Sequence, residues 1–386
     1  MDTLLKHICQ YRTNKVDVNH IDLDMYVSTE NMLPNKQGIC ISKSYPESGY
    51  VNEYKQGDIL ISNIRPYFKK IYLAKNDGGC SADVLVITPQ KGINNVFLYY
   101  LLSQDSFFDY VMSGSKGCKM PRGDKKYIME WSIPVFDSIN QQQIAGILSS
   151  LDAKIETNNK LNEKLEEMAQ AIFKSWFVDF EPFKDQPFHE TELGMIPEGW
   201  KVVSLCDIAN FTNGLAMQKY RPNDDEAYLP VLKIKELRQG FCDDTSEICT
   251  NNISEDYIAE DGDVIFSWSG TLLVDIWCGG ECGVKQHLFK VTSEDYNKWF
   301  YYYWIKKHLE EFIRIAKDKA VTMGHIKREH LRNALVVVPD KKTMHNADKI
   351  FSPIINRIIE SRIESKRLAS LRDTLLPRLM SGEIKI

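Results

Sequence analysis

Apolar side chains recur at alternating steps of three and four residues along two stretches of this 386-residue chain. The first stretch runs from Ile144 to Ile172 and the second from Ile350 to Leu375. A heptad pattern sustained in this way predicts a long helix that packs against another helix. The positions expected to pair the helices are Ile147, Leu151, Asn158, Leu161, Leu165, Met168, Ile172, Ile350, Ile354, Leu368, Leu371 and Leu375.

The second stretch repeats the first at an offset of 203 residues, and segments 163–177 and 366–380 align without a gap. A repeat of this length indicates that whole domains were duplicated, each followed by a long helix. The first helix should end near Phe180, because Pro182 disfavours helical geometry in the preceding residue. The expected divisions are a first domain at 1–139, a central long helix within 140–183, a second domain at 184–340 with a connector at 184–195, and a C-terminal long helix within 341–386.

Short apolar runs and an aromatic helix recur in the same order in both domains. The runs expected to form strands in the first domain are 57–65, 82–88 and 131–136, and the expected amphipathic helix is 96–112. The matching segments of the second domain are strands at 262–270 and 335–339 and a helix at 299–313. The predicted fold class is therefore α+β, with two α/β domains in tandem.

Composition limits the cellular setting of the chain. Apolar residues make up 43% of the sequence, and no run approaches the roughly 20 apolar residues that span a bilayer. We expect a soluble, cytoplasmic protein. The nine cysteines lack the spacing of a disulfide framework, and no second pair completes a zinc site with Cys278 and Cys282. Reduced thiols are expected, with a metal site as the alternative interpretation.

The charge is distributed unevenly between the domains. The whole chain carries a net charge of −5, whereas residues 1–139 carry 16 basic and 15 acidic side chains and residues 190–340 carry 17 and 25. Bulk charge therefore gives no argument for nucleic-acid binding, and any such role requires local basic patches.

Two glycine-containing basic loops provide such patches at equivalent places in the repeat. Clustered lysine and arginine side chains bind phosphate, and polar side chains on loops read base edges. The alternative for each loop is an ordinary solvated surface. The candidate DNA-binding residues here are Lys116, Lys119, Arg122, Lys125 and Lys126 in the first domain, and Lys317, Lys319, Thr322, His325, Lys327 and Arg328 in the second.

Further candidates follow the Gly-Asp strands that begin at Gly57 and Gly262. Arg65 can make bidentate contact to guanine or phosphate, or it can pair with a carboxylate at the strand end. His287 is interpreted as structural rather than catalytic, because no nucleophile is suitably spaced. The other candidates are Asn63, Tyr67, Lys69, Lys70, Lys219, Arg221, Trp268, Ser269, Lys285 and Gln286, with Arg65 and His287 included in the DNA-binding set.

Enzyme signatures are nearly absent from the sequence. It contains neither of the glycine-rich nucleotide-binding patterns, nor the Asn/Asp-Pro-Pro-aromatic tetrapeptide of amino-methyltransferases. Asp340, Glu364 and Lys366 resemble a Mg²⁺-dependent nuclease pattern. Glu364 lies within the predicted second long helix, whereas such nuclease motifs belong on adjacent strands, so we predict no catalytic residue and no metal site.

The segments LNEKLEEMAQAIFKSWFVDFEPF and LRDTLLPRLMSGEI, together with the two Gly-Asp strands, resemble Type I restriction–modification specificity subunits. The resemblance covers the chain in order and with its duplication. One departure is that the first domain lacks the Pro-Glu-Gly-Trp opening that the second has at Pro197 to Trp200. This departure affects only the first few residues of the alignment.

The resemblance implies a non-catalytic DNA-recognition subunit. Two target recognition domains would each bind one half of an asymmetric, bipartite site in double-stranded DNA. The long helices would pair as an antiparallel coiled coil with pseudo-twofold symmetry, set the spacer between half-sites and dock two methyltransferase subunits. Restriction subunits would join this core. The chain itself would need no cofactor, because S-adenosylmethionine, ATP and Mg²⁺ would belong to the partner subunits.

Two other functions remain open. A coiled-coil scaffold with two protein-binding domains agrees with the acidic second domain, and it would show no sequence-specific DNA retention. A self-sufficient nuclease or methylase would show activity as a purified single chain.

Overall fold

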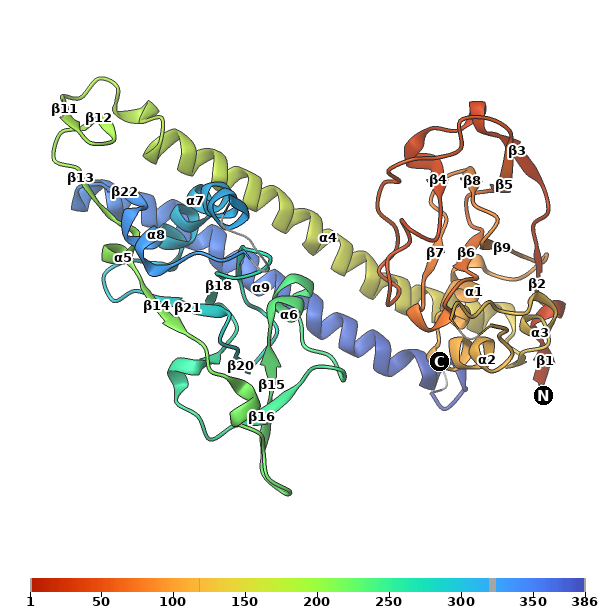
Figure 1. Ribbon diagram of the computed structural model, residues 1–386. Helices are drawn as coiled ribbons and strands as arrows, with labels where there is room; N and C mark the ends of the chain where they lie inside the picture. The colour runs from red at the N-terminus through yellow and green to blue at the C-terminus, as the bar shows by residue number, and fades with distance from the viewer. Residues whose placement is uncertain (1, 118, 319–323, 385–386) are drawn as a thin grey trace. The chain divides into compact units, whose positions relative to one another are not determined.

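Two helices of 40 residues each carry the predicted heptad segments, α4 (Ser138–Phe177) and α9 (Lys341–Met380). The computed structural model describes residues 2–117, 119–318 and 324–384. The chain forms two compact units, Met1–Lys154 with Leu368–Ile386, and Ile155–Arg367 (Figure 1). Each unit therefore consists of one globular domain together with a part of both long helices.

The first unit contains two four-stranded sheets, and helix α1 (Asn95–Leu102) packs on one of them. One sheet is antiparallel, and its Gly-Asp strand β6 lies between β9 and β7. Its strands in spatial order are β2 (Cys9–Tyr11), β9 (Val84–Pro89), β6 (Ile59–Ser62) and β7 (Ile71–Leu73). The strands of the other sheet are β3 (Lys15–Asp17), β5 (Tyr50–Tyr54), β8 (Gly78–Cys80) and β4 (Tyr26–Val27). The short strands β1 (Asp2–Leu4) and β10 (Ser132–Pro134) pair where the domain leads into α4.

The second unit repeats this plan. Its antiparallel sheet has the same order as that of the first unit, with β14 (Asn210–Asn213), β21 (Leu288–Thr292), β18 (Val264–Ser267) and β19 (Leu273–Ile276). Its other sheet has the order β16 (Ile248–Thr250), β15 (Tyr228–Leu232), β20 (Cys282–Val284) and β17 (Ile258–Ala259). The short pair is β13 (Lys201–Ser204) with β22 (Leu335–Val338), and a hairpin of β11 (Phe188–Thr191) and β12 (Gly194–Pro197) lies in the connector.

The second sheets of the two units differ at their outer strands. In both units a central strand pairs with one parallel and one antiparallel neighbour, β8 with β4 and β5, and β20 with β15 and β17. The fourth strand then joins the antiparallel neighbour in the first unit and the parallel neighbour in the second. The duplication is thus retained in the inner strands and changed at the sheet edges.

The single helix expected at 96–112 is wrong, because the structure has two helices there, α1 (Asn95–Leu102) and α2 (Asp105–Ser113). Ser103 ends the first helix, and its hydroxyl donates to the carbonyl of Tyr99 at 2.7 Å. Gln104 then adopts an extended conformation before Asp105 begins the second helix. Serine competes for backbone hydrogen bonds in this way and favours helix ends. The equivalent helix of the second unit, α7 (Lys298–Asp318), is continuous.

Within the second unit, α4 and α9 lie side by side in opposite directions. Asn158 donates to the carbonyl of Ser361 at 3.4 Å and to Glu364 Oε2 at 2.8 Å. Further toward the C-terminal end of α4, the rings of Phe173 on α4 and Phe351 on α9 lie 6.4 Å apart. Asn158 and Ser361 are equivalent in the 203-residue repeat, so this contact joins matching positions of the two helices.

The burial of side chains corrects the phase of the predicted helix seam. Ile147, Met168 and Leu371 are 37%, 45% and 47% exposed, whereas Asn158 and Ile354 are buried. The remaining predicted positions, Leu151, Leu161, Leu165, Ile172, Ile350, Leu368 and Leu375, are half-buried. The fully buried side chains of α4 are displaced by about one residue from the prediction, because this helix also packs on the domains; they include Leu148, Ala169, Phe173 and Phe177.

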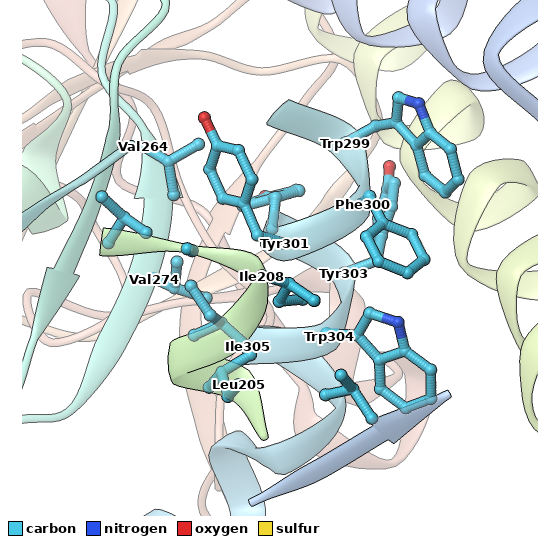
Figure 2. Close-up of a cluster of buried hydrophobic side chains, with 14 of the residues drawn as sticks. Leu205, Ile208, Val264, Val274, Trp299, Phe300, Tyr301, Tyr303, Trp304 and Ile305 are labelled. Carbon is cyan, nitrogen blue, oxygen red and sulfur yellow. The ribbon is translucent and has the colours of Figure 1, made fainter. Parts of the chain in front are cut away.

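An aromatic cluster forms the core of the second unit where α7 faces the sheet and the long helices. Figure 2 shows Trp299, Phe300, Tyr303 and Trp304 on successive turns of α7. The same view places Val264 and Val274 from the sheet, and Leu205 and Ile208 from the short helix α5 (Leu205–Ile208), against the other side of α7. On the α4 side, the ring of Phe177 lies 5.7 Å from Trp299.

The Gly-Asp dipeptides before β6 and β18 are structural turns. Gly57 and Gly262 have φ angles of 88° and 98°, a conformation that glycine adopts without steric cost. The following carboxylates close the turns, because Asp58 accepts from the amide of Lys55 at 2.8 Å and Asp263 from that of Glu260 at 2.9 Å. The motif thus fixes where each strand begins, and the candidate residues lie at the other end of the strand.

Candidate DNA interface

Three segments far apart in the sequence meet at the end of β6 in the first unit. The amide of Asn63 donates to the carbonyl of Asp83 at 2.9 Å. The amide of Gly123 donates to the carbonyl of Asn63 at 3.2 Å, and the amide of Arg65 to the carbonyl of Pro121 at 2.8 Å. The loop after β6, the residues before β9 and the basic loop therefore form one surface.

The second unit builds the same arrangement at the end of β18. The amide of Trp268 donates to the carbonyl of His287 at 3.3 Å, and the amide of Ile326 to the carbonyl of Trp268 at 3.0 Å. The amide of Gly270 donates to the carbonyl of Gly324 at 2.8 Å. Three hydrogen bonds thus recur in the same pattern, which makes the two surfaces equivalent.

The equivalence relates individual positions. Asn63 corresponds to Trp268 at the strand end, Asp83 corresponds to His287, and Arg122 corresponds to His325. We call these the reading positions. They have the same backbone in both units and chemically different side chains.

Arg122 and Asp83 form an exposed ion pair in the first unit. Arg122 Nη2 lies 3.2 Å from Asp83 Oδ1, and their side chains are 53% and 36% exposed. On the same loop, Lys116 Nζ donates to Asp124 Oδ2 at 2.8 Å. That hydrogen bond and those from the amides of Tyr127 and Lys126 lower the pKa of Asp124 to about 2. Asp124 thereby caps the short helix α3 (Lys125–Ile128) and orders the basic loop.

Other basic candidates of the first unit differ in their exposure and in the contacts that they make within the domain. Arg65 is exposed, with φ at 51°, beside the exposed ring of Tyr67. Lys69 Nζ pairs with Asp105 Oδ2 at 3.1 Å, and Lys70 Nζ donates to the carbonyl of Thr29 at 2.6 Å. Burial lowers the pKa of Lys70. Both lysines thus make contacts within the domain, and their assignment to DNA contact stays a prediction.

Three lysines on the basic loop and on the following helix α3 are more accessible. Lys119 and Lys126 are exposed and have no ion pair among the described residues. Lys125 is also exposed, and its Nζ lies 6.0 Å from the centre of the Tyr11 ring. These side chains are suited to contact the phosphate backbone.

Aromatic and imidazole rings dominate the reading positions of the second unit. The Trp268 ring lies 5.7 Å from His287 and 6.4 Å from His325. Gln286 Nε2 lies 3.4 Å from His287 Nε2, at the edge of this group. Trp268 Nε1 and His287 Nδ1 are buried without a hydrogen-bond partner among the described residues. His325 is exposed.

Three further candidates of the second unit are buried or make contacts within the domain. Ser269 is only 5% exposed. Lys285 Nζ lies 3.0 Å from Glu247 Oε2. Arg328 donates through Nη2 to the carbonyl of Phe211 at 3.1 Å, and its guanidinium lies over the Phe289 ring. These contacts leave less of each polar group available, and the assignment of the three residues to DNA contact stays a prediction.

The remaining candidates lie around or away from this surface. Lys317 and Lys327 are exposed at the two ends of the second basic loop, whereas Lys319 and Thr322 lie outside the described residues. Lys219 and Arg221 are exposed on a different segment, next to β16 through the hydrogen bond from the amide of Thr250 to the carbonyl of Tyr220 at 2.8 Å. The sequence search for basic residues missed Asp83, whose only signal is its place at the start of the predicted strand 82–88.

The nuclease-like residues have structural roles in the second unit. Asp340 caps the start of α9 by accepting from the amides of Lys342 and Thr343 at 2.9 and 3.0 Å. Glu364 lies on α9 and accepts from Asn158. Cys278 and Cys282 are both buried, which raises the pKa of each thiol, that of Cys278 to about 11. Across residues 2–117, 119–318 and 324–384, no three His, Cys, Asp or Glu side chains are grouped for metal binding.

Comparison with known proteins identifies the family. The model of the Type I restriction modification DNA specificity domain matches residues 6–167 and 197–370, one match for each half of the duplication. The chain belongs to this family. It is a specificity subunit of the Type I kind, with two recognition domains in tandem.

Relatives of this specificity subunit cover most of its length. It is 28% identical to the Type I restriction enzyme MjaIX specificity subunit of Methanocaldococcus jannaschii over 86% of this chain and 79% of that protein. It is 24% identical to the HindI specificity subunit of Haemophilus influenzae over 96% of both chains. The crystal structure of the S subunit from M. genitalium superposes with a TM-score of 0.59 at 16% identity, over 98% of this chain and 96% of that one, which shows the shared fold.

No helix in the described parts of the chain has the length and apolarity needed to cross a membrane.

Proposed function

We propose that this specificity subunit is the non-catalytic component that selects the DNA site of a Type I restriction–modification enzyme. Each recognition domain binds one half of a bipartite, asymmetric sequence in double-stranded DNA. The observation that carries the proposal is the pair of equivalent surfaces with different side chains at the reading positions. Equal backbones allow both domains to approach DNA in the same way, and unlike side chains select different bases.

The long helices set the distance between the half-sites and dock two methyltransferase subunits, and restriction subunits join that core. A helix of 40 residues is about 60 Å long at 1.5 Å per residue, and half-sites one turn of DNA apart lie about 34 Å from each other. The paired helices are therefore long enough to separate two domains on one face of the duplex. S-adenosylmethionine, ATP and Mg²⁺ are assigned to the partner subunits.

Exchange of the first domain tests the reading of half-sites. Residues 1–139 are replaced by the corresponding domain of a relative, and the methylated motif is determined in cells that also express the methyltransferase. We expect one half-site to change while the other half-site and the spacer stay constant. A change in both halves, or in neither, would contradict the division of the site between domains.

Insertion of one heptad into both helices tests the spacer. The insertions are placed after Lys154 and after Arg367, where the chain passes between the two units. Seven residues add about 10 Å of helix and rotate it by only about 20°, so the spacer should lengthen by about three base pairs. An unchanged spacer would show that the helices do not set it. A scaffold protein would give no chain-dependent motif in either experiment.

A further inference from the structure

Arg122 and His325 occupy the same place in the two domains and have chemically different side chains. Arg122 lies in an isolated bridge with Ile64, and His325 in the matching bridge with Ser269. Both side chains are exposed at the end of the central strand of their sheet. Arg122 is thus placed where its exposed side chain can contact a ligand.

Asp83 orients the guanidinium of Arg122 and leaves most of it available. The contacts between the two side chains involve only Nη2 of the arginine, 3.2 Å from Oδ1 and 3.5 Å from Oδ2. The N–H groups on Nε and Nη1 donate to no other group among the described residues. Nη2 carries two N–H groups, one beside Nε–H and one beside Nη1. A carboxylate at one of them leaves the other edge of the guanidinium with two donors, which match the O6 and N7 acceptors of guanine in the major groove.

The carboxylate also argues against phosphate as the target of Arg122. A negative charge within 4 Å of the guanidinium weakens its attraction for phosphate and repels the phosphate directly. Lys119 and Lys126 on the same loop and its following helix lack such a partner in the described chain and are better suited to that contact. The loop therefore separates two tasks, phosphate contact by lysines and base contact by the arginine.

We propose that Arg122, positioned by Asp83, recognises a guanine in the half-site bound by the first domain. The proposal rests on the proposed function and adds the base and the residue that reads it. His287 and His325 replace the ion pair in the second domain, so this guanine contact belongs to one half-site only. That difference contributes to the asymmetry of the whole site.

Methylated motifs of four variants test the assignment, each expressed with the methyltransferase. Arg122→Ala should lower the preference for guanine at one position of one half-site by on the order of 10- to 100-fold. Arg122→Lys keeps the positive charge without the fork and should relax the same position. Asp83→Asn keeps the side-chain shape and should weaken the preference there to a smaller extent. Lys119→Ala is the matched control, and it should lower methylation uniformly without changing the motif.

The outcomes separate this assignment from the proposed function. If the wild-type chain directs no motif, the proposed function fails. If it directs a motif but Arg122→Lys leaves every position as selective as before, Arg122 acts as a point charge and the assignment is overturned. Relaxation in both half-sites, or a first half-site without a G·C pair, also overturns it. If Arg122→Ala abolishes methylation altogether, the motif of Arg122→Lys decides whether Arg122 recognises guanine or acts as a point charge.

Discussion

The two Gly-Asp turns allow a direct test of how burial sets the strength of equivalent interactions. In the first unit, Asp58 is 2% exposed and accepts from Arg12 Nε at 2.7 Å and from Thr88 Oγ1 at 2.8 Å. It also accepts from the amide of Lys55. Substitution of Asp58 by alanine removes the acceptor of all these donors and leaves Arg12 with Glu53 at 4.0 Å as its nearest counter-charge.

The expected cost follows from the surroundings of each carboxylate. Removal of one partner of a buried ion pair costs about 3–5 kcal/mol, because the other charge loses its main compensation. The Arg12 side chain is 19% exposed and keeps only the longer contact to Glu53, so the lower end of this range is expected. The side chain of Asp263 is 26% exposed, and its partner Lys290 also donates to the carbonyl of Ile258 at 2.7 Å. Asp263→Ala should therefore cost only about 1–2 kcal/mol.

Hydrogen exchange measured by mass spectrometry reports each unit separately. Asp58→Ala should speed exchange in β6 and β9 by about 100-fold or more and leave β18 and β21 unchanged. Asp263→Ala should affect only β18 and β21, by about tenfold. Equal effects of the two substitutions, or a larger effect of Asp263→Ala, would refute the reasoning from burial.

Three further predictions concern the helices and the basic loop. Phe177→Ala should destabilise the second unit by about 3–5 kcal/mol in chemical denaturation, because the ring is fully buried, whereas the exposed Met168→Ala should change it by less than about 0.5 kcal/mol. Arg372 Nη1 lies 2.6 Å from Asp152 Oδ1 in a half-buried pair, so a double-mutant cycle on their alanine variants should give a coupling of about 1–2 kcal/mol; additive effects would contradict the pairing. The lowered pKa of Asp124 means that its capping contribution is complete above its unfolded pKa near 4 and is lost as the pH falls toward about 2. Carboxyl chemical shifts in an NMR titration should show this midpoint, and an unshifted midpoint near 4 would contradict the cap.

The duplication and the two helices could be predicted from the sequence because they leave long periodic signals. The heptads of α4 and α9 recur at an offset of 203 residues and the Gly-Asp strands at an offset of 205, and neither signal depends on tertiary detail. The phase of the seam was less predictable, since α4 contacts a helix and the domains at once. Ile147 and Leu148 are adjacent and both apolar, and only the packing decides that Leu148 is the buried one.

The candidate surface could be predicted only in part. The basic loops were recognisable by composition, and the structure places them at equivalent positions. Their meeting with the strand ends depends on the sheet order, which brings Asn63, Asp83 and Arg122 together across 59 residues of sequence. Ion pairs between distant residues could not be predicted either. Nothing near Lys285 in the sequence indicates that it pairs with Glu247.

The central claim is that this chain determines which DNA sequence its enzyme modifies. Methylome sequencing of cells that express the methyltransferase with this chain, compared with cells that lack only this chain, tests that claim most directly. We predict a bipartite, asymmetric methylated motif with a fixed spacer that is present only when the chain is expressed. An identical set of methylated sites in both cultures would contradict the claim and would favour a scaffold role for the two domains.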